Sequence, residues 1–157
     1  MFGAADPEQA ISQLEAYHLE GRGERAEVMA SALVDQLISQ KPRDDQTQGI
    51  LVKGLRILAA VLNSREKYKR ARITIGLLHK HRNKHGKAVG HDPVTAAADY
   101  HLAGFIHANS GKVGAAKKAF SRCQKLQPGH LAAALDVAEQ CGYNKVLSKL
   151  YPKAGPV

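Results

Sequence analysis

The chain contains no tryptophan and only 5% aromatic residues, although 44% of its residues are hydrophobic. A core with few large rings must be built from Ala, Leu, Ile and Val, which suits closely packed helices better than a sandwich of strands. A chain of 157 residues has the length of one domain and can bury about 70% of its extended surface. We therefore expect an all-α fold that needs no disulfide.

Long apolar runs and paired thiols are also missing. No segment approaches the ~18 apolar residues of a membrane span, and the acidic opening of the chain lacks the features of a signal peptide. We therefore expect a cytoplasmic protein that makes no contact with membranes. Cys123 and Cys141 show neither CxxC nor Cys/His metal spacing, so we expect buried, reduced thiols.

The sequence contains no motif of a common catalytic or nucleotide-binding site. GxSxG, HExxH and GxxxxGK[ST] are absent, and no acidic pair has a spacing that would separate two pKa values. His81 and His85 have the i, i+4 spacing of a metal pair, but the basic residues around them would repel a divalent cation. We therefore expect no enzyme, no metal site and no cofactor.

Capping residues and apolar periodicity predict seven or eight helices, paired as antiparallel hairpins. Asp6-Pro7 starts the first helix, Asp44 or Asp45 starts the third, and Asp92-Pro93 starts the fifth. The expected stops are near Gly21, before Pro42, near Ser64, near Leu78, near Asn109 and near Leu126, with a loop from His79 to Gly90 and two last helices at about Leu131–Cys141 and Asn144–Tyr151.

The segment from Ala97 to Pro128 places large and small residues at characteristic intervals. The residues concerned are Tyr100, Ala103, Gly104, His107, Ala116, Phe120 and Pro128. Gly104 and Ala116 would let two helix backbones approach, while Phe120 and Tyr100 fill the wedge between them. In this spacing the segment resembles a tetratricopeptide repeat, whose pattern is W-x2-L-G-x2-Y, A-x3-F and P. The resemblance implies helical hairpins that stack as a short solenoid.

The same skeleton recurs at a 45-residue step, with Ala26, Ala71 and Ala116 in one column. A family repeat has about 34 residues, so longer helices or inserts must follow the first two units. We therefore expect a single TPR-like domain over residues 1–157, with units at about 7–40, 52–85 and 97–130 and capping helices at 131–151.

The resemblance further implies a ligand groove on the concave face formed by the first helix of each hairpin. The positions beside the packing residues are Lys53, Arg56 and Asn63 in the second unit, and His101, Phe105 and Asn109 in the third. The leading hypothesis is a non-enzymatic adaptor or chaperone that binds an acidic or amphipathic segment of another protein there.

The net charge of +9 suggests a second hypothesis, because it is concentrated in the middle of the chain. Residues 1–48 have 4 basic and 9 acidic residues, residues 49–91 have 11 and 1, and residues 92–157 have 8 and 4. Such a field also suits nucleic acid, although only Tyr68 could stack on bases. The basic patch would comprise Arg65, Lys67, Lys69, Arg70, Arg72, Lys80, Arg82, Lys84 and Lys87. A third hypothesis is a homodimer or homo-oligomeric scaffold in which the groove of one copy holds the amino-terminal helix of another.

Overall fold

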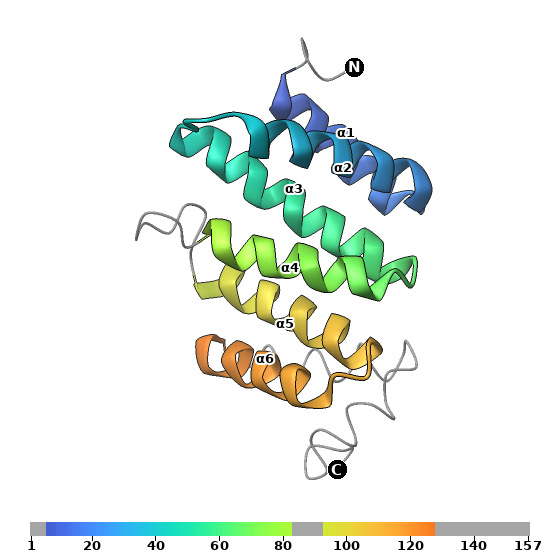
Figure 1. The fold of residues 1–157 in the computed structure, drawn as a ribbon, viewed down its shortest axis with the longest axis vertical. Helices are drawn as coiled ribbons and strands as arrows, with labels where there is room; N and C mark the ends of the chain where they lie inside the picture. Colours follow the sequence, from blue (N-terminus) through green and yellow to red (C-terminus); the bar gives the residue numbers. More distant parts are fainter. Residues whose placement is uncertain (1–5, 83–92, 128–157) are drawn as a thin grey trace. The chain divides into compact units, whose positions relative to one another are not determined.

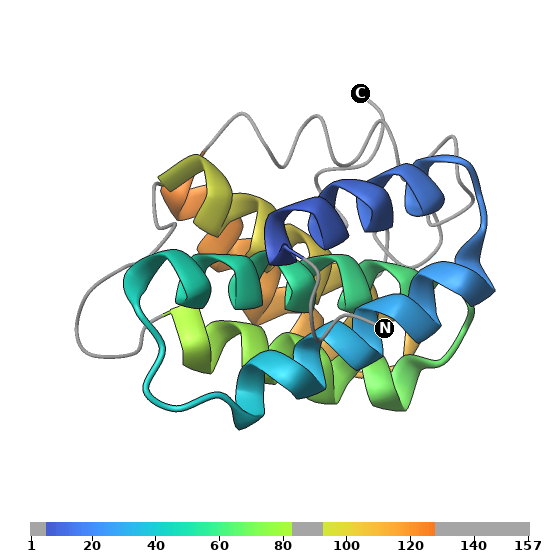
Figure 2. The same cartoon turned by 90° about the horizontal axis from the view of Figure 1, so that it is seen from above.

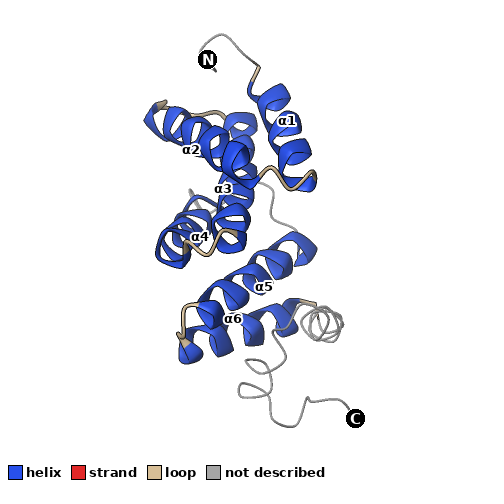
Figure 3. Ribbon diagram, turned by 90° about the vertical axis from the view of Figure 1, so that its right-hand side faces the viewer, coloured by secondary structure: helices blue, strands red, loops and turns tan. Residues whose placement is uncertain are grey.

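The computed structural model describes residues 6–82 and 93–127, and every regular element within these ranges is a helix (Figure 3). The elements are α1 (Pro7–Leu19), α2 (Gly23–Ser39), α3 (Asp45–Ser64), α4 (Tyr68–Arg82), α5 (Pro93–Asn109) and α6 (Val113–Leu126). The prediction of an all-α chain is confirmed for this part. The two last expected helices lie outside the described residues, and the solenoid arrangement stays a prediction.

The chain divides into two compact units, Met1–His91 and Asp92–Val157. In the first unit, α1 pairs with α2 and α3 pairs with α4, and α3 also contacts α1 and α2. Figures 1 and 2 both show α3 running beside these neighbours, so it forms the centre of that unit. In the second unit, α5 and α6 form one further hairpin.

Local capping chemistry explains where the helices begin. Asp6 caps α1 by accepting a hydrogen bond from the Glu8 N–H at 3.1 Å, and Pro7 occupies the first helical position. Asp44 caps α3 by accepting from the Thr47 N–H at 2.7 Å, so Asp44 and not Asp45 is the cap. Hydrogen bonds from the side chain and backbone of Thr47 hold the pKa of the Asp44 carboxyl below its ordinary value.

All three hairpins turn in the same way. Each turn contains one residue of positive φ: Gly21 (76°), Glu66 (62°) and Gly111 (74°). The next N–H then donates to a carbonyl five residues earlier, from Arg22 to Tyr17 at 2.9 Å, from Lys67 to Leu62 at 2.9 Å and from Lys112 to His107 at 2.8 Å. This is the Schellman arrangement, which ends a helix on a left-handed residue. The turns therefore recur at the same 45-residue step as the alanine column.

Small residues at the predicted positions allow close helix contacts. A Cβ added at Gly104 would lie 2.5–2.7 Å from three ring atoms of Phe120, so only glycine fits against this ring. Gly54 in α3 has ordinary close contact with α2 and α1, because an added Cβ would meet Val34 at 3.4 Å and Ile11 at 3.8 Å. The expectation of close packing at Gly104 is confirmed, and Gly54 is a second such position.

The end of the fourth helix was predicted too early. α4 continues through His81 to Arg82, and both residues are buried, with 7% and 1% of their surface exposed. The sequence suggested a loop from His79 because basic and polar residues dominate there. The backbone nevertheless stays helical, and Gln48 Nε2 of α3 donates to the His81 carbonyl at 2.9 Å, which satisfies one carbonyl of the last turn.

Candidate functional site

Three of the predicted binding residues share one face of α3. Lys53, Arg56 and Asn63 follow one another at spacings of three and seven residues, which keeps them on the same side of a helix. Lys53 is exposed, and Arg56 and Asn63 are half-buried. Other sides of α3 pack against α1, α2 and α4, and within this polar strip Lys53 is the most exposed residue.

The other three predicted residues share one face of α5. His101, Phe105 and Asn109 recur every four residues and are half-buried. The His101 and Phe105 rings lie edge to face with centroids 4.6 Å apart, and Phe105 lies 5.4 Å from the buried Phe120 in the same geometry. The aromatic pair is therefore anchored on the hairpin core while part of its surface stays accessible.

Glu27 of α2 binds three cations of the predicted basic patch, a pairing that the sequence analysis did not predict. Its Oε2 accepts hydrogen bonds from Lys67 Nζ at 2.8 Å and Arg70 Nη1 at 3.0 Å. Arg65 Nε lies 2.9 Å from Oε1, a charge contact that is not aligned as a hydrogen bond. These three cations therefore join the two hairpins of the first unit.

The same contacts determine the ionisation of Glu27. Burial alone would raise the pKa of its carboxyl, but the hydrogen bonds from Lys67 and Arg70 and the charges of Lys67 and Arg65 outweigh burial. The pKa is therefore held below its ordinary value, and Glu27 is a carboxylate at neutral pH.

The remaining patch is smaller than predicted. Arg82 does not belong to the surface, because only 1% of it is exposed and its Nη2 lies 3.0 Å from His79 Nδ1. Lys84 and Lys87 lie outside the described residues. Lys69 and Lys80 are exposed and Arg72 is half-buried. Charge counting missed this reduction because it gives a buried or paired cation the same weight as a solvated one.

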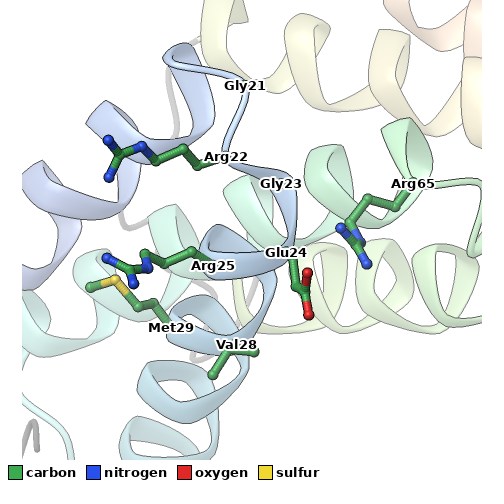
Figure 4. Close-up of a pocket in the computed structure, with 8 residues that line it drawn as sticks. All are labelled: Gly21, Arg22, Gly23, Glu24, Arg25, Val28, Met29 and Arg65. Carbon is green, nitrogen blue, oxygen red and sulfur yellow. The ribbon is translucent and has the colours of Figure 1, made fainter.

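A hollow of about 790 Å³ lies beside the α1–α2 turn (Figure 4). Figure 4 shows Arg22 and Arg25 on one side of the start of α2, with Arg65 and Glu24 on the other. Arg22 and Arg25 each lie 5.6 Å from the centre of the Tyr17 ring, and Arg22 Nε also lies 3.2 Å from the Glu20 carboxylate. These guanidinium groups therefore already have internal partners on the walls of the hollow.

A second, more apolar groove runs between α2 and α4, with α3 beneath it, and has a volume of about 250 Å³. Its apolar residues are Val34 and Ile38 of α2, Leu55 and Leu58 of α3, and Ile73 and Leu77 of α4. This groove was not predicted. The available signal was Ile73, an apolar residue on the outward side of a strongly basic helix, which is 59% exposed.

The described residues offer few features for chemistry. Burial raises the pKa of the Cys123 thiol to about 11, which confirms the expected buried thiol and leaves little thiolate at neutral pH. Within residues 6–82 and 93–127, no three His, Cys, Asp or Glu side chains converge as a metal site. In the same ranges, no helix has both the length and the apolar character that crossing a bilayer requires.

Comparisons with protein-family models, with curated proteins and with solved structures find no match to this chain.

Proposed function

We propose that this protein is a non-enzymatic binding module, an adaptor or chaperone that holds a segment of another protein on a surface of helical hairpins. The observation that carries the proposal is the recurrence of one hairpin turn at Gly21, Glu66 and Gly111. Repetition of a helical hairpin builds an extended surface of parallel ridges, which is the form in which repeat proteins bind polypeptides.

The tetratricopeptide resemblance supports this proposal through the α5–α6 hairpin. The contact between Gly104 and the Phe120 ring has the small-against-large character that the repeat pattern requires at these two positions. Ala116, on α6, is fully buried, as a second small residue of the pattern should be.

The outward faces supply suitable contact residues. Lys53, Arg56 and Asn63 present charge and amide groups along α3, and His101 with Phe105 presents a partly accessible aromatic pair on α5. Aromatic side chains and arginine are enriched at protein-binding surfaces, and Phe105 and Arg56 are of these types. An acidic or amphipathic segment is the partner that these faces fit best.

Nucleic-acid binding is the weaker alternative. Phosphate recognition needs several solvated cations on one side of the molecule. In the part of the chain that the structure describes, Arg65, Lys67 and Arg70 pair with Glu27 and Arg82 is buried. The exposed cations of α4 are Lys69, Arg70 and Lys80, and Arg70 already shares the Glu27 carboxylate, so few cations of this helix remain for phosphate.

Site-specific photo-crosslinking in cells that carry the chain naturally tests the proposal. A crosslinking residue replaces Lys53 of α3 in one variant and Ile73 of α4 in another. Leu19, which is 85% exposed near the end of α1, serves as the matched control position. We expect adducts with a second polypeptide at Lys53 or Ile73 that survive nuclease treatment and are absent at Leu19.

Each other result contradicts the proposal in a different way. Nuclease-sensitive adducts would identify a nucleic-acid-binding protein, and adducts of two copies of the chain would identify a homo-oligomeric scaffold. Absence of adducts at both test positions, or equal labelling at Leu19, would show that neither face binds a protein.

A further inference from the structure

The groove between α2 and α4 is held open at both ends. At one end, the Glu27 carboxylate of α2 binds Lys67 and Arg70, and Arg70 Nη2 also lies 3.5 Å from Ser31 Oγ. These bonds link the amino-terminal part of α2 to the start of α4. The spacing of the groove walls at this end is therefore determined by charged hydrogen bonds rather than by apolar contact.

A polar chain links the opposite ends of the same helices. Arg43 Nη1 donates to the carbonyls of Leu37 and Ile38 at 3.0 and 3.1 Å, which caps the end of α2. Its Nε donates to Gln48 Oε1 at 2.7 Å, and Gln48 Nε2 donates to the His81 carbonyl of α4 at 2.9 Å. With both ends linked, the middle of the groove is a preformed depression.

The floor and walls of this depression are apolar. Leu55 and Leu58 of α3 form the floor and are almost fully buried, while Ile73 and Leu77 of α4 form one upper edge. A volume of about 250 Å³ lies below the ~300–1,000 Å³ of typical small-molecule sites. The size suits one or two apolar side chains that project from a larger partner.

Two residues on the outer side of α4 contribute little to the core of their own unit. Ile73 is 59% exposed, although a β-branched residue on a solvated helix face gives poor helix propensity. Gly76 lies one turn away, and a Cβ added there would meet no atom within 4 Å in the part of the chain described. A glycine in a helix interior destabilises the helix relative to alanine, but it lets another backbone approach closely.

The charged residues around the groove favour a partner of one charge sign. α4 has no acidic residue, and its outward side carries Lys69 and Lys80, with Arg72 at its margin. The pairing at Glu27 leaves a surplus of positive charge, because three cations share one carboxylate. Asp35 on the α2 side is the opposing acidic residue at the groove. The field over α4 is therefore positive, and it favours a negatively charged partner.

We propose that the α2–α4 groove binds an amphipathic helix of another protein, with a large apolar side chain inserted between Ile38, Leu58 and Leu77. The acidic flank of that helix lies over Lys69 and Lys80, and its backbone passes close to Gly76. This inference builds on the proposed function and specifies its partner. The groove lies on the α2–α4 side of α3, and its lining does not include Lys53, Arg56 or Asn63.

Fluorescence anisotropy with the full chain and a designed helical peptide of about 15 residues tests the proposal. The peptide carries Leu and Phe on one face and Glu beside them. One control peptide has the same composition in scrambled order, and a second has Lys in place of Glu. We expect binding of the amphipathic acidic peptide alone, and a loss of about tenfold or more in Ile73→Asp. Leu19→Asp, the same change at an exposed leucine outside the groove, should leave binding unchanged.

Further variants test the charge and backbone contacts. Lys69→Glu combined with Lys80→Glu should weaken binding of the acidic peptide and allow the peptide with Lys in place of Glu to bind. Gly76→Ala should weaken binding while raising the thermal midpoint of the chain. Because Ile73, Lys69, Lys80 and Gly76 are exposed, these changes leave the core intact.

Equal binding of the scrambled peptide, or undiminished binding by Ile73→Asp, would overturn the groove assignment. So would the absence of binding at peptide concentrations on the order of 1 mM. If this occurs while Lys53 still crosslinks to a protein in cells, the proposed function stands and only the groove assignment fails. Loss of protein adducts at both Lys53 and Ile73 would instead remove the proposed function.

Discussion

The first and third hairpins place opposite residue sizes at the same two positions. In α1–α2 the pair is Leu14 with Ala30, whereas in α5–α6 it is Gly104 with Phe120, and all four side-chain positions are buried. The middle hairpin, with Ala59 and Ile75, lies between these extremes. The comparison shows that the turn and the helix pairing persist while the large residue moves from one helix to the other. We therefore infer that the packing requires complementary volume across the hairpin, not a fixed residue at either position.

Of the changes considered, breaking this complementarity should cause the largest loss in the free energy of unfolding. Phe120→Ala should lower the free energy of unfolding by about 3–5 kcal/mol, because the ring is fully buried and glycine opposite it leaves a cavity. Gly104→Leu combined with Phe120→Ala copies the Leu14/Ala30 pair and should recover part of that loss. Urea denaturation of the wild type, both single variants and the double variant measures the coupling.

Gly104→Ala and Gly76→Ala provide the control for this cycle, because both replace a glycine in a helix interior. Gly104→Ala should destabilise by about 1–3 kcal/mol through its clash with Phe120. Gly76→Ala should stabilise by about 1 kcal/mol through helix propensity alone. If the changes in unfolding free energy of Gly104→Leu and Phe120→Ala simply add in their double variant, the two residues do not pack as a pair. Stabilisation by Gly104→Ala would contradict the pairing as well.

The turns offer a second comparison, because one of the three uses a residue poorly suited to its backbone. Glu66 has a φ of 62°, whereas Gly21 and Gly111 occupy the equivalent positions in the other hairpins. Glu66→Gly should stabilise the chain by about 1 kcal/mol, since left-handed backbone disfavours side chains. Gly21→Ala and Gly111→Ala should destabilise by a similar amount. A loss of stability in Glu66→Gly would show that the middle turn depends on its side chain.

The smallest expected effect concerns the link between the first two hairpins. Glu27→Gln removes the carboxylate that binds Lys67, Arg70 and Arg65, and solvent screening of these cations limits the loss to about 0.5–1 kcal/mol at neutral pH. Because the folded pKa of Glu27 lies below the ordinary 4.5, its contribution is present above that pH. It is lost as the pH falls through the folded pKa.

The stability difference between wild type and Glu27→Gln should therefore be constant near neutral pH and shrink under acid conditions. Urea denaturation across this pH range measures it, with Glu24→Gln, an exposed change on the same helix, as the control. A difference that grows as the pH falls would have the wrong sign for a carboxylate with a lowered pKa.

The sequence predicted well those features that depend on neighbouring residues. The Asp6 and Asp44 caps, the turn glycines and the Gly104/Phe120 contact each follow from spacing within one helix or one hairpin. The pairing of Glu27 could not be predicted in this way, because its partners lie about 40 residues further along the chain and reach it only through the packing of α2, α3 and α4.

The candidate site shows the same limit. Lys53, Arg56 and Asn63 fall on one face of α3, as helical periodicity predicts. The α2–α4 groove depends on the distance between two helices that are held apart by polar links at both ends, and no local pattern encodes that distance. Arg82 was assigned to a solvated loop because its neighbours are basic, yet α4 continues and buries it.

An NMR titration of the isotopically labelled chain with the acidic amphipathic peptide would locate the contact surface through backbone amide shifts. If the α2–α4 groove binds the helix, shifts concentrate at Ile73, Gly76 and Leu77 of α4 and at Asp35 and Ile38 of α2. Shifts confined to Lys53, Arg56 and Asn63, or a uniform weak response that disappears with added salt, would contradict it.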